Sequence, residues 1–261
     1  MTTRSFHAGT VRVHVHPTAA ASGAAAAAHF QQAAARILAQ KSECNTLFAG
    51  AQSQSAFHAA LRELPDVDWS RIRAFAIDEF LDPDLPLDCA VAAQPTRDLF
   101  KHVRPAQVHV FDVAAAAPTA AAEQFATLLR RHPPDLACLG IGHNGHLALN
   151  EPGAARLDDP LLVRCVKLDE TTRAQLAADP NFSALPAIPT RGVTLTVPAL
   201  LMAQTILCCA PSAAKAAVLR RFFQSPVSED LPASTLKSHP DATLYLDAAA
   251  FADSADLFPV S

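Results

Sequence analysis

The chain has 261 residues, 50% hydrophobic content and a formal net charge of −4 at pH 7. This length can bury a full hydrophobic core. The mild acidity excludes the strongly basic surface that attracts nucleic acids or anionic membranes, so we expect neither as a partner. An anionic small molecule could still bind through a few local hydrogen-bond donors.

The cysteines and apolar segments favour a reduced, cytoplasmic protein. No two of the six cysteines have C-x-x-C spacing, and several lie in apolar runs such as residues 136–139. The first residues lack an apolar core of signal-peptide length, and no run of about 18 apolar residues occurs. We therefore expect buried thiols and no membrane span.

Strands and helices are predicted to alternate along the whole chain. Residues 11–15 alternate apolar and polar side chains, as a half-buried strand does, and an Ala-rich helix follows to about residue 40. This order predicts an α/β fold with a mainly parallel sheet covered on both faces, in one domain over 1–261. Further strands are expected at 46–48, 72–77, 108–111, 135–140, 163–168, 193–197, 205–209 and 243–246, and helices at 56–64, 92–102, 120–131 and 213–223.

Polar segments follow three of the predicted strands, at 50–53, at Asp78-Glu79 and at 140–153. Ligands of such sheets bind at the carboxyl ends of the strands, so we expect one shared site. Backbone N–H groups of the turn formed by Gly50, Ala51, Gln52 and Ser53 could bind a phosphate there. Lys215 could reach the same phosphate or be an ordinary surface charge, and Asp78-Glu79 could be a general base or a helix cap.

The loop at 140–153 combines glycines with an acid/base pair. Gly140, Gly142 and Gly145 allow tight turns and close approach to a ligand. His146 and Glu151 suit proton transfer, because a carboxylate can orient and charge an imidazole. Three other interpretations compete: a G-x-G-x-x-G dinucleotide site, a metal pair of His143 and His146, and a purely structural turn.

The sequence of this loop, GIGHNGHLALNEPG, resembles the signature of the glucosamine-6-phosphate deaminase/isomerase family, whose relatives include galactosamine-6-phosphate isomerases and 6-phosphogluconolactonases. Shorter matches lie at 77–80, 168–173, 189–196 and 232–236, so that the resemblance covers roughly 45–247. It implies a three-layer αβα fold with a Rossmann-like sheet. It also implies conversion of glucosamine or galactosamine 6-phosphate to a ketose 6-phosphate plus ammonia, without metal or organic cofactor.

The resemblance also implies a role for each site residue. Asp78 matches the base that moves a proton between C1 and C2, His146 matches the residue that assists ring opening, and Glu151 matches its carboxylate partner. Lys215 and the turn at 50–53 match phosphate-binding positions, and Gly145 is expected to contact the substrate. Asn144 is counted as catalytic because it can hydrogen-bond His146, although it cannot carry charge as the more usual Asp does.

Some departures from the family pattern concern substrate recognition. Ala51 and Gln52 stand where glycines are common, residues 81–93 lack a His-Pro-x-Ser pattern, and the arginine that the family pattern places near 178 to bind substrate hydroxyls is replaced. The alternatives are therefore a 6-phosphogluconolactonase-type hydrolase, another sugar-phosphate isomerase, or a weakened sugar-phosphate-binding protein. The Asn-Glu-Pro at 150–152 favours deaminase chemistry over lactonase chemistry. A homo-oligomer is compatible with the sequence.

Overall fold

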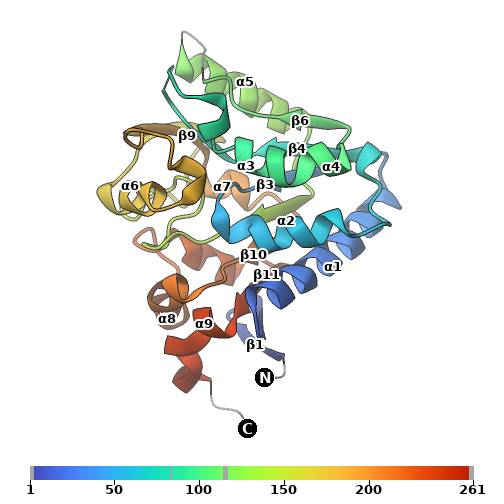
Figure 1. Ribbon diagram of the computed structural model, residues 1–261, viewed down its shortest axis with the longest axis vertical. Helices are drawn as coiled ribbons and strands as arrows, with labels where there is room; N and C mark the ends of the chain where they lie inside the picture. Colours follow the sequence, from blue (N-terminus) through green and yellow to red (C-terminus); the bar gives the residue numbers. More distant parts are fainter. Residues whose placement is uncertain (1–2, 83, 114–116, 259–261) are drawn as a thin grey trace.

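The structure, a computed structural model, describes residues 3–82, 84–113 and 117–258. Its main sheet has the strand order β1-β2-β11-β10-β7-β3-β4-β6 (Figure 1). Neighbouring strands run parallel except for β1 and β2, which form an antiparallel hairpin at one edge. The strands are β1 Arg4–Ala8, β2 Val11–His16, β3 Cys44–Phe48, β4 Ile72–Ala76, β6 Gln107–His109, β7 Leu136–Leu139, β10 Thr205–Cys209 and β11 Ala242–Asp247.

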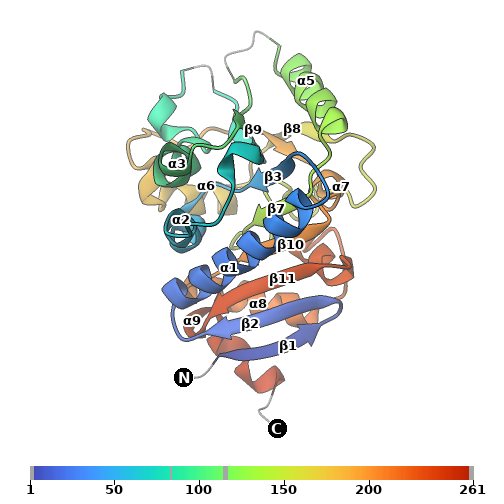
Figure 2. The ribbon, with the colours of Figure 1, turned by 90° about the vertical axis from the view of Figure 1, so that its right-hand side faces the viewer.

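Helices cover both faces of this sheet, because successive strand side chains point to opposite faces. On β10, Leu207 and Cys209 pack in the same cluster as α1 and α2, whereas Ile206 and Cys208 pack with α8 and α9. Figure 2 shows α1 lying across the face opposite to α8 and α9. The predicted three-layer αβα fold with a mainly parallel sheet is therefore confirmed.

The helices follow the predicted order with shifted ends. The segment expected as one helix at 92–102 is helical, but its middle is a π turn, Thr96–Phe100. No helix of the described residues is both long and apolar enough to cross a membrane. The α-helices are α1 Ala19–Leu38, α2 Ser55–Arg62, α3 Ala93–Pro95, α4 Lys101–Val103, α5 Pro118–Arg131, α6 Glu170–Ala177, α7 Val197–Leu200, α8 Ala216–Gln224 and α9 Ala248–Phe251.

Two of the predicted strands belong to a second sheet, which the sequence did not reveal. β8 (Val163–Lys167) and β9 (Arg191–Leu195) pair antiparallel, and β5 (Asp78–Phe80) joins the other side of β9. The expectation that these strands extend the parallel sheet is wrong. Only Ile77 separates β4 from β5, and its carbonyl accepts the Leu195 N–H at 2.8 Å, so the chain leaves the main sheet there. This change of sheet places Asp78 over the strand ends.

The sequence pattern predicts no strand at β1. The strand pairs with β2 through the two-residue turn of Gly9 and Thr10, in which Gly9 has a φ of +63°. A two-residue turn containing glycine between alternating segments is a hairpin signal. Its partly exposed side chains hid the strand, because neither face carries a continuous apolar row.

The strand order reverses between β3 and β7. From β3 the chain proceeds outward to β4 and β6, and from β7 it proceeds the other way to β10 and β11. Such a reversal leaves a crevice at the carboxyl ends of the two central strands, where ligands of open α/β sheets bind. The polar segments that begin at Gly50 and Gly140 follow these two strands.

Candidate active site

A cavity of about 60 Å³ lies at this reversal point, where β3, β4, β7 and β10 end. The structure brings together there the turn after β3, the Asp78 carboxyl, the glycine loop and the Lys215 side chain. Gln52, Asn144, Gly145 and Glu151 lie outside the lining. The lining residues are Ala49, Gly50, Ala51, Ser53, Ile77, Asp78, Phe80, Val91, Gly140, Ile141, Gly142, His146, Ala148, Leu149, Thr172, Gln175, Leu176, Phe182 and Lys215.

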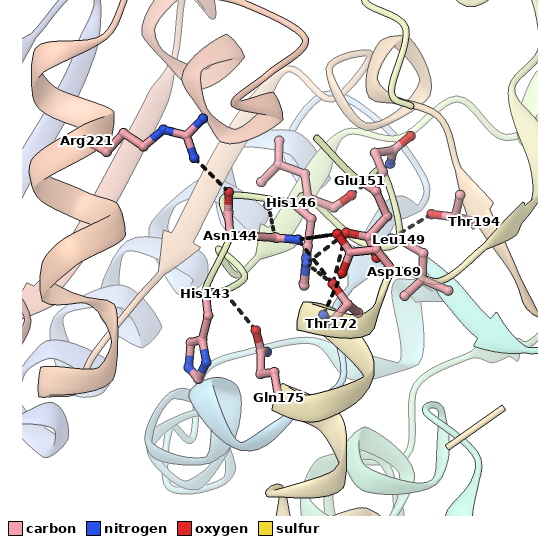
Figure 3. A network of polar contacts seen from close by, with 12 residues as sticks. His143, Asn144, His146, Leu149, Glu151, Asp169, Thr172, Gln175, Thr194 and Arg221 are labelled. Atoms are coloured by element: carbon pink, nitrogen blue, oxygen red, sulfur yellow. Dashed lines mark hydrogen bonds and ion pairs between the residues drawn. The ribbon is translucent and has the colours of Figure 1, made fainter. Parts of the chain in front are cut away.

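The His146 imidazole is tied to Glu151 through the hydroxyl of Thr172 (Figure 3). The hydroxyl donates to Glu151 Oε2 at 2.9 Å and lies 2.9 Å from His146 Nδ1. Because a threonine hydroxyl has one proton, His146 must donate from Nδ1 to the Thr172 oxygen. The neutral ring therefore keeps Nε2 as its acceptor, on the side available for proton transfer.

The imidazole ring and the carboxylate also lie close to each other. His146 Nδ1 lies 3.6 Å from Glu151 Oε2, and both side chains are almost fully buried. Burial raises the pKa of Glu151, but the contacts with His146, Asn144 and Thr172 outweigh burial and leave that pKa below its ordinary value. Glu151 is therefore held as a carboxylate that can stabilise an imidazolium.

Asn144 joins two carboxylates behind the histidine. Its side-chain amide donates to Glu151 Oε2 at 2.9 Å and to Asp169 Oδ2 at 3.2 Å, while its Oδ1 accepts the His146 backbone N–H at 3.0 Å. Only an amide can donate to the two carboxylates and accept from the backbone in this position. The departure from Asp at position 144 thus matches its surroundings.

Asp78 and Glu79 are neighbours on β5, so their carboxyl groups point to opposite faces of that strand. Glu79 accepts three backbone hydrogen bonds, from Phe80 at 2.8 Å, Val91 at 2.8 Å and Ala92 at 3.0 Å, so it holds the segment after residue 90. Asp78 instead lines the cavity. Burial, followed by the charge of Glu79, raises the pKa of Asp78 to about 7. A carboxyl with this pKa suits reversible proton transfer at neutral pH.

The turn after β3 has a backbone conformation that normally requires glycine. Ala51 has φ 107° and ψ 160° and precedes the 3-10 turn η1, Gln52–Gln54, which leads into α2. Below the turn, the Gln54 amide lies within hydrogen-bonding distance of the carbonyls of Leu139 and Cys209. Gln54 therefore connects the ends of β3, β7 and β10 beneath the cavity.

Lys215 contributes a buried cation to the cavity. It ends the 3-10 turn η6, Ala213–Lys215, before α8, and it is 6% exposed. Burial lowers the pKa of Lys215 to about 8. Among the residues that the structure describes, no carboxylate oxygen lies within 4.0 Å of its ammonium. An anionic ligand would pair with the ammonium and compensate for the hydration that it lost on burial.

Two glycines of the loop leave no room for a side chain. A Cβ on Gly142 would lie 2.2 Å from the His146 ring, and a Cβ on Gly145, which has φ +95°, would lie 2.1 Å from Leu231. The loop continues as turns and opens no helix, unlike a dinucleotide fingerprint. Within the described ranges, no group of three or more His, Cys, Asp or Glu side chains is arranged to hold a metal.

Sequence reasoning assigned no role to three residues of the site, all on α6 or its N-cap. They are Asp169, which accepts from Asn144, Thr172, which bridges His146 and Glu151, and Gln175, whose Oε1 accepts the His143 N–H at 2.7 Å. Asp169 and Thr172 lie in the segment 168–173 that carried part of the resemblance. The order of residues alone did not reveal that this helix faces the glycine loop.

The sequence model of the family described as glucosamine-6-phosphate isomerases/6-phosphogluconolactonase matches residues 17–245. Among curated relatives, glucosamine-6-phosphate deaminase of Lysinibacillus sphaericus is 32% identical over 183 residues, which cover 70% of this chain and 80% of that protein. The deaminase of Streptococcus thermophilus is 31% identical over 187 residues, covering 72% and 78%.

Solved structures of related enzymes share the fold. A monomeric glucosamine-6-phosphate deaminase superposes with a TM-score of 0.80 at 23% identity, covering 92% of this chain and 99% of that chain. The 6-phosphogluconolactonase of Trypanosoma brucei superposes with a TM-score of 0.75 at 19% identity, covering 93% and 98%. Both reactions therefore occur on this fold, and the choice between them depends on the side chains of the site.

Proposed function

The chain belongs to the family of glucosamine-6-phosphate isomerases and 6-phosphogluconolactonases, and on that premise we propose that it converts an amino-sugar 6-phosphate to a ketose 6-phosphate and ammonia. The proposed substrates are glucosamine 6-phosphate and galactosamine 6-phosphate. Asp78, His146, Glu151 and Asn144 form the proposed catalytic group.

The observation that carries the proposal is that Asp78 and His146 line one cavity, each prepared for a different proton transfer. Asp78 has a pKa near 7 and can both take and return a proton. His146 has its Nδ1 engaged by Thr172, which leaves Nε2 to act on the substrate. An aldose–ketose isomerisation needs both functions.

We assign the phosphate to the turn of Gly50, Ala51, Gln52 and Ser53 and to Lys215. Backbone N–H groups at the start of a helix favour an anion, and the buried ammonium adds a full positive charge. Gly145 does not line the cavity, and its N–H bonds to the Gly142 carbonyl at 3.0 Å. We therefore propose that Gly145 acts on the substrate indirectly, by setting the shape of the loop.

The reaction begins with ring opening. His146 Nε2 moves a proton from the C1 hydroxyl to the ring oxygen, which leaves an aldehyde at C1. The carboxylate of Glu151 stabilises the imidazolium that forms during this transfer. Asn144 and Thr172 hold that carboxylate in place.

Isomerisation and ammonia release follow. Asp78 removes the proton from C2 while a proton of the substrate's own ammonium group passes to the C1 oxygen, which gives an enol-amine between C1 and C2. Asp78 then returns the proton to C1, and C2 becomes an imine. Water adds to C2 and ammonia leaves, so the products are the ketose 6-phosphate and ammonia. This sequence needs only side chains, water and substrate.

An assay of ammonia release from glucosamine 6-phosphate and galactosamine 6-phosphate tests the proposal. We expect release with at least one of them, and loss of about 10²–10⁴-fold in kcat for Asp78→Asn, the range for one acid/base group. The same protein is tested on 6-phosphogluconolactone. Hydrolysis of the lactone without ammonia release from either amino sugar would refute the proposal and favour the lactonase alternative.

A further inference from the structure

An internal carboxylate occupies part of the turn assigned to the phosphate. The backbone N–H of Gln52 donates to Oδ2 of Asp179 at 3.1 Å. Gln52 directly follows Ala51 and begins the turn that leads into α2. The N–H that would bind a substrate phosphate thus already has an anionic acceptor from another part of the chain.

The Asp179 side chain is fixed in this position by its own loop. It follows α6 and caps the 3-10 turn η5, Pro180–Phe182, through hydrogen bonds from the Asn181 backbone and side-chain nitrogens to Oδ1, both at 2.9 Å. Arg97 in turn donates to Asn181 Oδ1 at 2.6 Å. One carboxylate oxygen therefore orders the loop, while the other faces the turn.

The charge of Asp179 acts on the second part of the phosphate site as well. Burial lowers the pKa of Lys215, and Asp179 is the carboxylate whose charge opposes that shift. A phosphate bound between the Gln52 N–H and Lys215 would meet the Asp179 carboxylate as a like charge. It would also have to replace Asp179 as the acceptor of the Gln52 N–H.

We propose that the Asp179 carboxylate competes with the substrate phosphate for the Gln52 N–H. This inference rests on the proposed function, because it assumes that the turn holds a phosphate. An anion then binds only when the loop after α6 withdraws its carboxylate. The loop directly follows α6, whose residues Thr172 and Gln175 line the cavity.

Titration with inorganic phosphate, followed by calorimetry, tests the competition without any turnover. We expect Asp179→Asn to bind phosphate about tenfold more tightly than the wild type, a difference of about 1.4 kcal/mol. Asn also caps helical turns well, so the loop keeps its start. The matched control is Glu170→Gln, which removes a carboxylate from the start of α6. The Glu170 side chain is 89% exposed and paired with Arg173, so this variant should change the phosphate affinity less than about twofold.

A second readout separates this inference from the proposed function. The KM of the wild type and of Asp179→Asn for the amino-sugar 6-phosphate is measured by ammonia release, and KM should fall in the variant. Equal or weaker phosphate binding by Asp179→Asn, or no detectable binding by either protein, overturns the role of Asp179. Failure of the wild type to release ammonia overturns the proposed function instead, whatever the phosphate titration gives.

Discussion

The side-chain amide of Asn144 donates a hydrogen bond of 2.9 Å to Oε2 of Glu151. The same nitrogen lies 3.2 Å from Oδ2 of Asp169, so one amide separates two carboxylates. An aspartate at 144 would lose this donor and place a third carboxylate between the other two. A site with Asn144 is therefore internally consistent, and the identity of this residue gives no physical reason to expect a weakened enzyme.

Asn144→Asp should thus reduce both activity and stability. We expect a loss of about 1.5–3 kcal/mol, the range for hydrogen bonds to charged groups, and with it a Tm lower by several degrees. Thermal unfolding and ammonia release measure the two effects. The double variant Asn144→Asp with Asp169→Asn removes the repulsion and should recover part of the loss. Higher activity in the single variant would contradict this account.

We expect kcat to depend on the hydroxyl of Thr172 more than on its methyl group. Thr172→Val keeps the shape but removes the bridge between His146 Nδ1 and Glu151 Oε2. We expect kcat to fall about tenfold, as for one lost hydrogen bond to a charged group. Thr172→Ser retains the hydroxyl and serves as the matched control. Equal kcat values for the two variants would show that the bridge has no catalytic role.

The raised pKa of Asp78 predicts how activity depends on pH. Because the proposed base acts as a carboxylate, kcat/KM should fall as pH drops below about 7, where Asp78 becomes protonated. Burial is the larger cause of the raised Asp78 pKa, and the charge of Glu79 raises it further. Glu79→Gln should therefore move the acidic limb of the profile to lower pH, provided that circular dichroism shows the variant folded. An acidic limb near pH 4 in the wild type would exclude Asp78 as the base.

The same pKa makes Asp78 a destabilising residue at neutral pH. Its folded pKa of about 7 lies above the unfolded value of 3.8, so the native state binds more protons between these values and loses stability as pH rises through them. Asp78→Asn should be more stable than the wild type at pH 8, by up to about 4 kcal/mol at 1.36 kcal/mol per pKa unit. The difference should vanish near pH 4.

Denaturant unfolding at several pH values measures this difference. The control is Asp158→Asn, which removes a carboxylate with an 82% exposed side chain and should leave the pH dependence unchanged. A stability gain that stays constant from pH 4 to pH 8 would mean that the gain does not arise from ionisation of Asp78.

The sequence predicted the parts of the site that depend on strand ends. The segments after β3, β4 and β7 could be placed together because parallel strands end at one edge of a sheet. The second sheet could not be predicted, since β8 and β9 read like any other strands and only their pairing with β5 separates them from the main sheet.

The contributions of Asp169 and Asp179 were hidden for another reason. Both look like ordinary residues that cap short helical segments, and both do so, at α6 and η5. Their second carboxylate oxygens reach Asn144 and Gln52, which are distant in sequence. Local patterns cannot reveal such long-range contacts, because these arise only when the loop after β8 folds over the strand ends.

Ala51 should carry backbone strain that glycine would relieve. Its φ of 107° and ψ of 160° fall in a region that costs a residue with a Cβ about 1–3 kcal/mol. Glycine adds about 0.4–1 kcal/mol of entropy to the unfolded state. The net expectation for Ala51→Gly is a gain of about 1 kcal/mol and a Tm higher by about 2–4 °C.

Two further substitutions complete this test. Ser212→Gly should also stabilise, because Ser212 has φ 88° and ψ 150° before η6. Ala49→Gly should destabilise, because Ala49 lies two residues before Ala51 but has no positive φ. The three Tm values together separate strain from the general cost of glycine. If Ala51→Gly lowered Tm as Ala49→Gly does, the turn would hold Ala51 without strain, and the alanine at this position would need another explanation.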